Sequence, residues 1–131
     1  MIYWTSIGLW ILYGILEGFR EACFYDVNSI VQTPNQSITW NLHPFFTMQR
    51  AIVLLLIYKV NGDFILLGGL PLIFSFVHDG MYYRIRNQLN NKVYSKGWWD
   101  NSTTSTAFIE LNIYERSVVF VIGITSLILF R

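Results

Sequence analysis

The stretch FILLGGLPLIFSFV, residues 64–77, decides the fold class, and it runs directly into the charged and aromatic sequence HDGMYYRIR. A helix that crosses the hydrocarbon core of a bilayer needs roughly 20 predominantly apolar residues. The uncharged run is shorter than that, and the helix reaches this length only when it continues through His78 and Asp79. We therefore predict a membrane-spanning helix over about residues 63–89, with a His-Asp pair inside the membrane boundary.

The composition of the whole chain favours a membrane protein. Hydrophobic residues make up 53% of the 131 residues and charged residues 13%, whereas soluble domains average about 25% charged residues. The aromatic content of 18% suits the belts of Trp and Tyr that form at membrane interfaces. The net charge of +1 offers no basic field for nucleic acid, so we expect the lipid bilayer as a partner and exclude nucleic acid.

Apolar segments recur four times along the chain, and each reaches the length of a membrane span once some charged residues are included. The second and third are joined by a short polar turn, Asn61-Gly62, which makes them antiparallel neighbours. Pro71 predicts a kink in the third. We predict an all-α fold, an integral membrane four-helix bundle of antiparallel transmembrane spans that forms a single transmembrane domain over residues 1–131. The spans are expected at about residues 2–24, 44–60, 63–89 and 107–131.

Charged residues gather in one half of this predicted bundle. Four antiparallel spans place the loops at about residues 25–43 and 90–106 on one side, and both termini with the Asn-Gly turn on the other. A charged side chain inside a bilayer costs about 2.5–3.5 kcal/mol on insertion scales, so we expect the charges near the two loops to turn inward and pair. With both histidines and two tyrosines, this predicted cluster comprises Glu17, Arg20, Glu21, His43, Arg50, His78, Asp79, Tyr82, Tyr83, Arg86, Glu110, Glu115 and Arg116.

Three members of the cluster, Glu17, His78 and Asp79, are candidate catalytic residues, because carboxylates and imidazole can accept and release protons. The other members are candidate ligand-binding residues, and the arginines among them suit a phosphate or an anionic lipid headgroup. Neighbouring residues point about 100° apart on a helix, so we expect His78 and Asp79 to contact other helices and not each other. The cluster could instead serve packing alone, through ion pairs and hydrogen bonds that fix the bundle.

The sequence assigns no metal site and leaves the cofactor unknown. As an alternative, His43 and His78 could ligate a haem or a metal ion from two neighbouring helices. The Glu-x-x-His pairs that hold di-iron centres in helical bundles are absent from the sequence. Five arginines in the same half of the bundle would also neutralise the carboxylates that a bound cation needs.

Two classes of function remain open from the sequence. The first is a structural, accessory or partner-binding membrane component, present as a homo-oligomer or within a larger membrane complex. The second is a membrane-embedded enzyme or transporter that uses the polar cluster for a lipid or phosphate headgroup, a proton, or a metal or haem. Basic residues around the second long loop predict that both loops are cytoplasmic and both termini lie on the opposite side.

Overall fold

The computed structural model describes residues 2–31, 43–89 and 111–131, with side chains over 2–24, 44–89 and 111–131. The described residues form four helices and no strand, so the prediction of an all-α fold is confirmed for this part of the chain. The helices are α1 (Ile2–Val31), α2 (His43–Asn61), α3 (Phe64–Leu89) and α4 (Ile113–Leu129).

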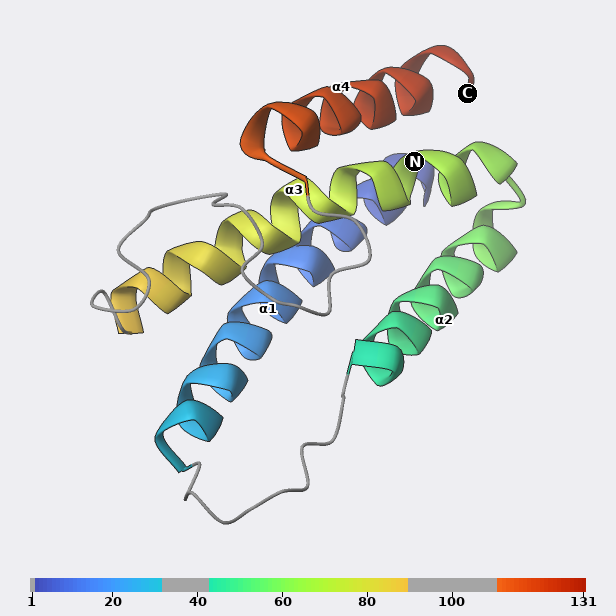
Figure 1. Cartoon of the computed structure of the whole chain (residues 1–131). Coiled ribbons are helices and arrows are strands. Elements are labelled where there is room, and N and C mark those ends of the chain that lie inside the picture. Colours follow the sequence, from blue (N-terminus) through green and yellow to red (C-terminus); the bar gives the residue numbers. More distant parts are fainter. Residues whose placement is uncertain (1, 32–42, 90–110) are drawn as a thin grey trace.

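The third helix is the centre of the structure, because α3 contacts each of the other three helices. Figure 1 shows the two ends of the chain and the connection between α2 and α3 together at one end of the molecule. Helices α1 and α3 run in the same direction, and α2 and α4 run in the opposite one. The up-and-down order directs the end of α1, the start of α2, the end of α3 and the start of α4 away from the chain ends, where the helices diverge and α4 begins beside the middle of α3.

The turn between α2 and α3 has the geometry that its sequence favours. Gly62 adopts a φ of 70°, in the left-handed region that glycine enters without steric cost, and its N–H donates to the Tyr58 carbonyl at 2.7 Å. Asp63 Oδ1 accepts a hydrogen bond from the Ile65 N–H at 2.9 Å, which satisfies one free donor at the start of α3. Helix α3 then continues through Pro71 to Leu89.

Helix α4 begins at Ile113, later than the predicted start near residue 107. Residues 107–110 lie outside the described part, but Leu111 and Asn112 are described and are not helical. Asn112 is the N-cap: its side chain accepts from the backbone of Tyr114 and Glu115, and Glu115 Oε2 accepts from the Asn112 N–H at 2.8 Å. This reciprocal capping box fixes the start of the helix.

Glycines allow the helices to approach closely at two crossings. On α1, Gly14 and Gly18 face α3, and a Cβ built at Gly18 would overlap the backbone carbonyl of His78. Where α3 meets α4, a Cβ at Gly123 would lie 3.0 Å from the Gly69 carbonyl oxygen. The spacing of Gly14 and Gly18 is the small-xxx-small pattern of tightly packed membrane helices, which our sequence interpretation did not use.

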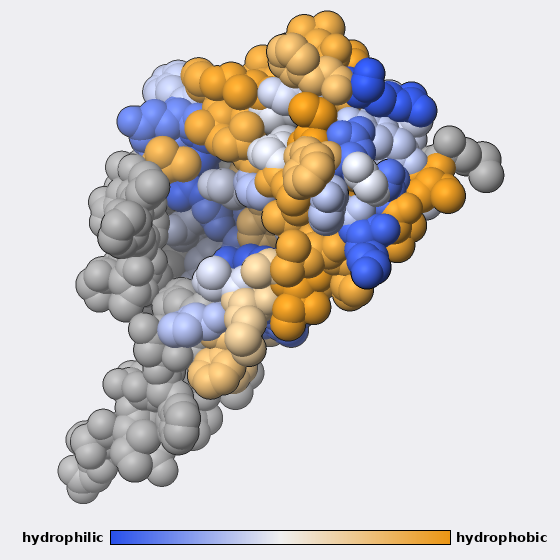
Figure 2. Space-filling model, turned by 90° about the vertical axis from the view of Figure 1, so that its right-hand side faces the viewer, coloured by the Kyte–Doolittle hydropathy of each residue, from blue (hydrophilic) through white to orange (hydrophobic). Residues whose placement is uncertain are grey.

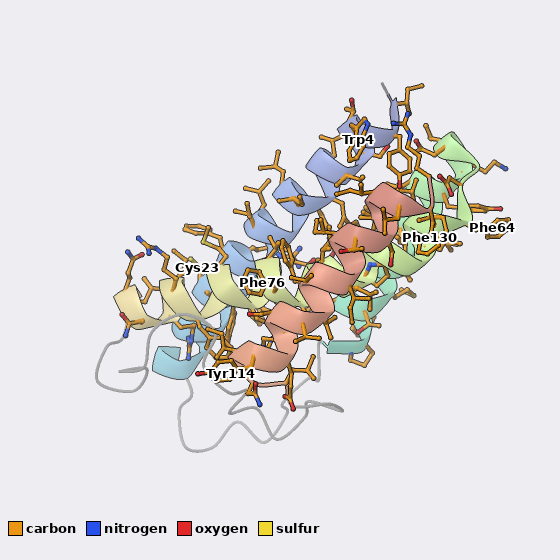
Figure 3. The ribbon with its side chains drawn as sticks, turned by 90° about the horizontal axis from the view of Figure 1, so that it is seen from above. Trp4, Cys23, Phe64, Phe76, Tyr114 and Phe130 are labelled. Carbon is orange, nitrogen blue, oxygen red and sulfur yellow. The ribbon has the colours of Figure 1, made fainter. Side chains whose placement is uncertain are left out.

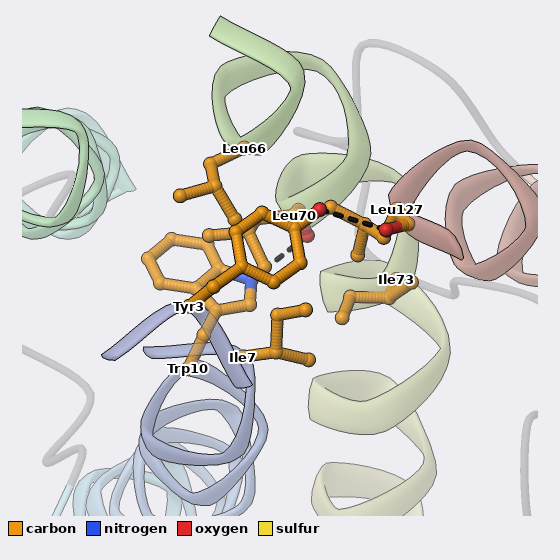
Figure 4. Packing of buried hydrophobic residues seen from close by; sticks show 7 residues of the cluster. All are labelled: Tyr3, Ile7, Trp10, Leu66, Leu70, Ile73 and Leu127. Atoms are coloured by element: carbon orange, nitrogen blue, oxygen red, sulfur yellow. Dashed lines mark hydrogen bonds between the residues drawn. The ribbon is translucent and has the colours of Figure 1, made fainter. Parts of the chain in front are cut away.

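A hydrophobic core occupies the half of the molecule near the chain ends (Figure 4). Its two polar side-chain groups are both satisfied: the Tyr3 hydroxyl donates to the Leu127 carbonyl at 2.7 Å, and Trp10 Nε1 donates to the Leu70 carbonyl at 2.8 Å. These two bonds tie α1 to α4 and to α3. The core consists of Tyr3, Ile7, Trp10, Leu66, Leu70, Ile73 and Leu127.

Many large hydrophobic side chains are exposed, and Figure 2 shows broad orange areas beside blue polar ones on one face of the molecule. Large hydrophobic side chains are exposed on all four helices, and no described side chain of α2 is fully buried. Among the described residues, two helices are long and apolar enough to cross a membrane, α1 over Ile2–Phe24 and α3. Exposed aromatic residues lie near both ends, with Trp4, Phe64 and Phe130 at one and Tyr114 at the other (Figure 3).

Candidate functional site

His78 lies at the centre of a group of charged side chains from all four helices. Its Nδ1 is 2.7 Å from Asp79 Oδ1, and its Nε2 is 2.8 Å from Glu21 Oε2 on α1 and 3.2 Å from Arg50 Nη2 on α2. The imidazole stacks on the Phe74 ring, with centroids 5.0 Å apart and planes 18° apart. Only 7% of the side chain is exposed, so the ring is held on both edges and on one face.

The expectation that His78 and Asp79 would not contact each other is wrong. The angle of about 100° separates the Cα–Cβ directions of successive residues, and side-chain torsions can close it. Nδ1 is the ring nitrogen nearest the backbone of His78. The aspartate side chain is short, so its carboxylate also lies near the backbone and within reach of Nδ1. Asp79 therefore reaches His78 with one oxygen and keeps the other for α4.

Arg50 ties α2 to α1. Its Nε donates to Glu17 Oε1 at 3.1 Å, its Nη2 donates to Glu21 Oε2 at 3.1 Å, and its guanidinium lies 4.8 Å from the centroid of the Phe74 ring. Glu17 is almost inaccessible, with 1% of its side chain exposed. Hydrogen bonds between ionised groups are among the stronger interactions in proteins, so Arg50 compensates for the loose packing of α2.

Arg116 ties α4 to α3 in the same way. Its guanidinium forms an ion pair with Asp79 Oδ2 and donates from Nη1 to Ser75 Oγ at 3.1 Å. Its Nε donates to the Leu111 carbonyl at 2.8 Å, just before the N-cap of α4. Only 3% of the side chain is exposed. The ion pair with Asp79 and the two hydrogen bonds satisfy the buried guanidinium. Ser75 was not a candidate in our sequence interpretation, although its spacing of four residues from Asp79 places both on one face of α3.

We name these six side chains the charged cluster: Glu17, Glu21, Arg50, His78, Asp79 and Arg116. Three carboxylates face two guanidinium groups within the cluster, and the more exposed Arg20 adds a third beside Glu17. Each ring nitrogen of His78 faces a carboxylate, so Glu21, His78 and Asp79 form one continuous chain of contacts between α1 and α3.

The Tyr13 hydroxyl and Glu17 Oε2 are both inaccessible and lie one turn apart on α1, beside the charged cluster. The Tyr13 hydroxyl faces the Glu17 carboxylate, which can accept its hydrogen bond. In the described part of the chain, no group of three or more His, Cys, Asp or Glu residues could hold a metal ion.

Other predicted site residues lie around the charged cluster or away from it. Arg20 is at the margin: its side chain is 49% exposed, and it contacts Glu17 at 3.6 Å and Gln49 Oε1 at 3.4 Å. Tyr82 and Tyr83 pack against Ala22 in a small second hydrophobic cluster, with the Tyr82 ring stacked 6.3 Å from that of His78.

Arg86 is buried further along α3, where its Nη1 donates to the Ala22 carbonyl at 3.5 Å. Glu115 is exposed and belongs to the capping box of α4, so it does not join the charged cluster. Glu110 lies outside the described residues. His43 begins α2, but its side chain is not described, so its predicted pairing with His78 on a haem or metal stays a prediction.

The fold and the charged cluster define a class of molecule: a small all-helical protein with two candidate membrane-spanning helices and buried charges shared by its helices. Comparisons of this chain with protein-family models, curated proteins and solved structures found no match. The function therefore has to be argued from the arrangement of these side chains.

Proposed function

We propose that the chain is an integral membrane protein that acts as a structural or accessory component of a larger membrane assembly, with its charged cluster fixing the arrangement of the helices. The observation that carries this proposal is the mutual pairing within the cluster. Arg50 joins Glu17 and Glu21, and Arg116 joins Asp79, so the cationic groups are already engaged by carboxylates of neighbouring helices. A phosphate or headgroup would have to displace these partners.

The apolar exterior supports a membrane location. Exposed leucine, isoleucine, valine and phenylalanine side chains on all four helices are unfavourable in water and favourable against lipid tails. Turning the charged residues inward removes them from hydrocarbon, and pairing offsets much of their desolvation cost. We further propose that α2 and α4 join the two candidate spans in the bilayer, with the two long loops on the cytoplasmic side.

The exposed face of α2 is where an assembly partner fits this proposal best. None of the described side chains of α2 is fully buried, and its contacts with α1 include the polar ones of Arg50, of Gln49 with Arg20, and of Asn61, whose Nδ2 donates to Ser6 Oγ at 2.9 Å. A second copy of the chain or another membrane protein would cover its apolar outer residues. These are Phe45, Met48, Ile52, Leu55, Leu56 and Val60.

A double-mutant cycle tests the structural role. Asp79→Asn and Arg116→Gln each leave a buried charge without its partner, which costs about 3–5 kcal/mol, whereas the combined variant removes both charges and should cost less than either single change. Thermal unfolding in detergent, followed by circular dichroism, gives the three values. Lys59→Gln, at an exposed position at the opposite end of α2, is the control. Costs that simply add would contradict pairing as the role of the cluster, and a chain released from membranes by alkaline carbonate would refute the membrane location.

A proton-handling function is the second candidate, favoured by the placement of His78 between the carboxylates of Glu21 and Asp79. Intramembrane ionisable groups in such chains form proton relays in pumps and transporters. The protein reconstituted into liposomes with a trapped pH-sensitive dye would report proton entry under an imposed potential. Flux that His78→Gln abolishes while the helical content persists would favour this candidate, and a wild-type protein without flux would exclude it.

A further inference from the structure

An apolar groove runs between α1, α3 and α4, outside the charged cluster. Its volume is about 310 Å³, at the lower end of the range for small-molecule sites. The walls come from Ile11 and Ile15 of α1, Val77 and Met81 of α3, and Phe120 of α4. Gly80 lies among the lining residues, so the side of the groove formed by α3 has no side chain at its middle. We call this feature the Arg84 groove, after the residue at its outer end.

The ends of the Arg84 groove differ in chemistry. At the inner end, the Phe76 and Phe120 rings pack 4.7 Å apart and close the groove with apolar surface. At the outer end is Arg84, an exposed cation eight residues further along α3. Eight residues of helix span about 12 Å, which is within the roughly 15 Å of one leaflet's hydrocarbon. The groove is thus apolar over the depth of the acyl chains and cationic at its outer end.

The depth of Arg84 agrees with this pattern. It lies 20 residues after Phe64, which begins α3 at the opposite end of the molecule, so about 30 Å of helix separate the two. That distance equals the thickness of a typical hydrocarbon core. If Phe64 is at one interface, Arg84 is at the level of the headgroups at the other, where an arginine can meet a phosphate directly.

We propose that the Arg84 groove binds one acyl chain of an anionic phospholipid, with the lipid phosphate held by Arg84. This inference rests on the proposed membrane location, and it places a headgroup site at the Arg84 groove because an exposed arginine there coincides with an apolar groove at the depth of the acyl chains. The complementarity is between a narrow apolar channel and the lipid chain, and between an interfacial cation and the negative phosphate.

Matched variants separate the two halves of the proposed site. Ile15→Trp places a large ring in the groove, and Leu16→Trp places the same ring on the exposed face of α1 at the same depth. Arg84→Gln removes the charge at the outer end, and Arg84→Lys retains it. Arg131→Gln removes an exposed arginine at the opposite end of the molecule and controls for general charge effects.

The full chain, purified in detergent with equal amounts of phosphatidylglycerol and phosphatidylcholine of identical chains, is measured by native mass spectrometry. We expect one retained lipid per chain with a preference for phosphatidylglycerol, a loss of that preference by about fivefold in Arg84→Gln, and no change in Arg84→Lys. Ile15→Trp should abolish retention of both lipids, and Leu16→Trp should leave it intact. A phosphatidylglycerol carrying a diazirine on its chain should label α1 or α3 at the groove after irradiation.

Three results would overturn the inference. Equal effects of Ile15→Trp and Leu16→Trp would show that retained lipid does not occupy the groove. Equal effects of Arg84→Gln and Arg131→Gln would show that the charge acts non-specifically. A lipid-free dimer that Ile15→Trp converts to monomer would assign the groove to a second copy. None of these three results contradicts the proposed membrane location if the chain resists extraction by alkaline carbonate. If carbonate releases the chain from membranes, both the membrane location and the lipid site are wrong.

Discussion

Replacing Gly18 by alanine should separate α1 from α3 at the level of the charged cluster. A Cβ at Gly18 would overlap the His78 carbonyl oxygen and lie 3.2 Å from the Tyr82 backbone nitrogen. Real Cβ contacts essentially never fall under 3.0 Å, and ordinary contact begins at 3.4 Å. The nearest atoms belong to the α3 backbone, which cannot rotate out of the way as a side chain can. The helices themselves must therefore move apart by at least about 0.4 Å.

The magnitude follows from what this movement does to neighbouring contacts. A shift of more than about 0.4 Å lengthens the 2.8 Å contact between Glu21 Oε2 and His78 Nε2 past the upper limit for a hydrogen bond. Overpacking costs about 1–3 kcal/mol, and a hydrogen bond to a charged group contributes about 1.5–3 kcal/mol. Because the two effects overlap, we expect Gly18→Ala to lower the free energy of unfolding by about 2–4 kcal/mol.

Gly8→Ala is the matched control, because it makes the same change on the same helix and its Cβ would meet nothing within 4 Å. Alanine favours helix over glycine by up to about 1 kcal/mol, so Gly8→Ala should be neutral or stabilising. Unfolding in detergent by a denaturing surfactant, followed by circular dichroism, compares the two variants in one assay. Gly18→Ala with the stability of Gly8→Ala would refute the close crossing and, with it, the helix spacing on which the charged cluster depends.

Two further changes test the ends of the bundle in the same assay. Trp10→Phe removes the 2.8 Å hydrogen bond to the Leu70 carbonyl while keeping most of the ring, and should cost about 0.5–1.5 kcal/mol; no loss would argue against this bond. Asn112→Ala removes the N-cap of α4 and should cost about 0.5–2 kcal/mol, whereas Asn112→Asp should retain most of the stability because aspartate caps equally well. Equal losses in the two Asn112 variants would contradict the capping box.

The sequence predicted the middle helices more accurately than the outer ends of α1 and α4. Helix α2 was expected at about residues 44–60 and α3 at about 63–89. Both ends of α2 and the start of α3 differ from these bounds by one residue, and the end of α3 agrees. The agreement is close because Pro44 and Asn61-Gly62 are strong local signals. The α1 helix continues past its apolar part to Val31, since hydropathy marks where a helix stops being apolar and not where it ends. The start of α4 was readable from Asn112 and Glu115, whose spacing of three residues is that of a capping box.

The membership of the charged cluster was partly readable from helix periodicity, but its pairing was not. Spacing places Glu17 and Glu21 one turn apart on α1, and a hairpin places Arg50 near them. Which nitrogen meets which oxygen depends on side-chain torsions, and this is why the contact between His78 and Asp79 was missed. Membrane topology and sidedness stay predictions, because only two described helices are long and apolar enough to cross a membrane.

The glycines and the charged cluster depend on each other. Packing of apolar side chains in a bilayer distinguishes poorly between helix registers, because lipid tails are as apolar as leucine. Gly14 and Gly18 permit a short distance between α1 and α3, but a small residue alone tolerates several registers. The hydrogen bond between His78 and Glu21 crosses from α3 to α1, and a shift of α1 by one turn would break it together with the pairing of Arg50 with both Glu17 and Glu21. The glycines thus set how near the helices lie, and the charges set which residues meet; buried polar groups are known to fix register in this way in coiled coils.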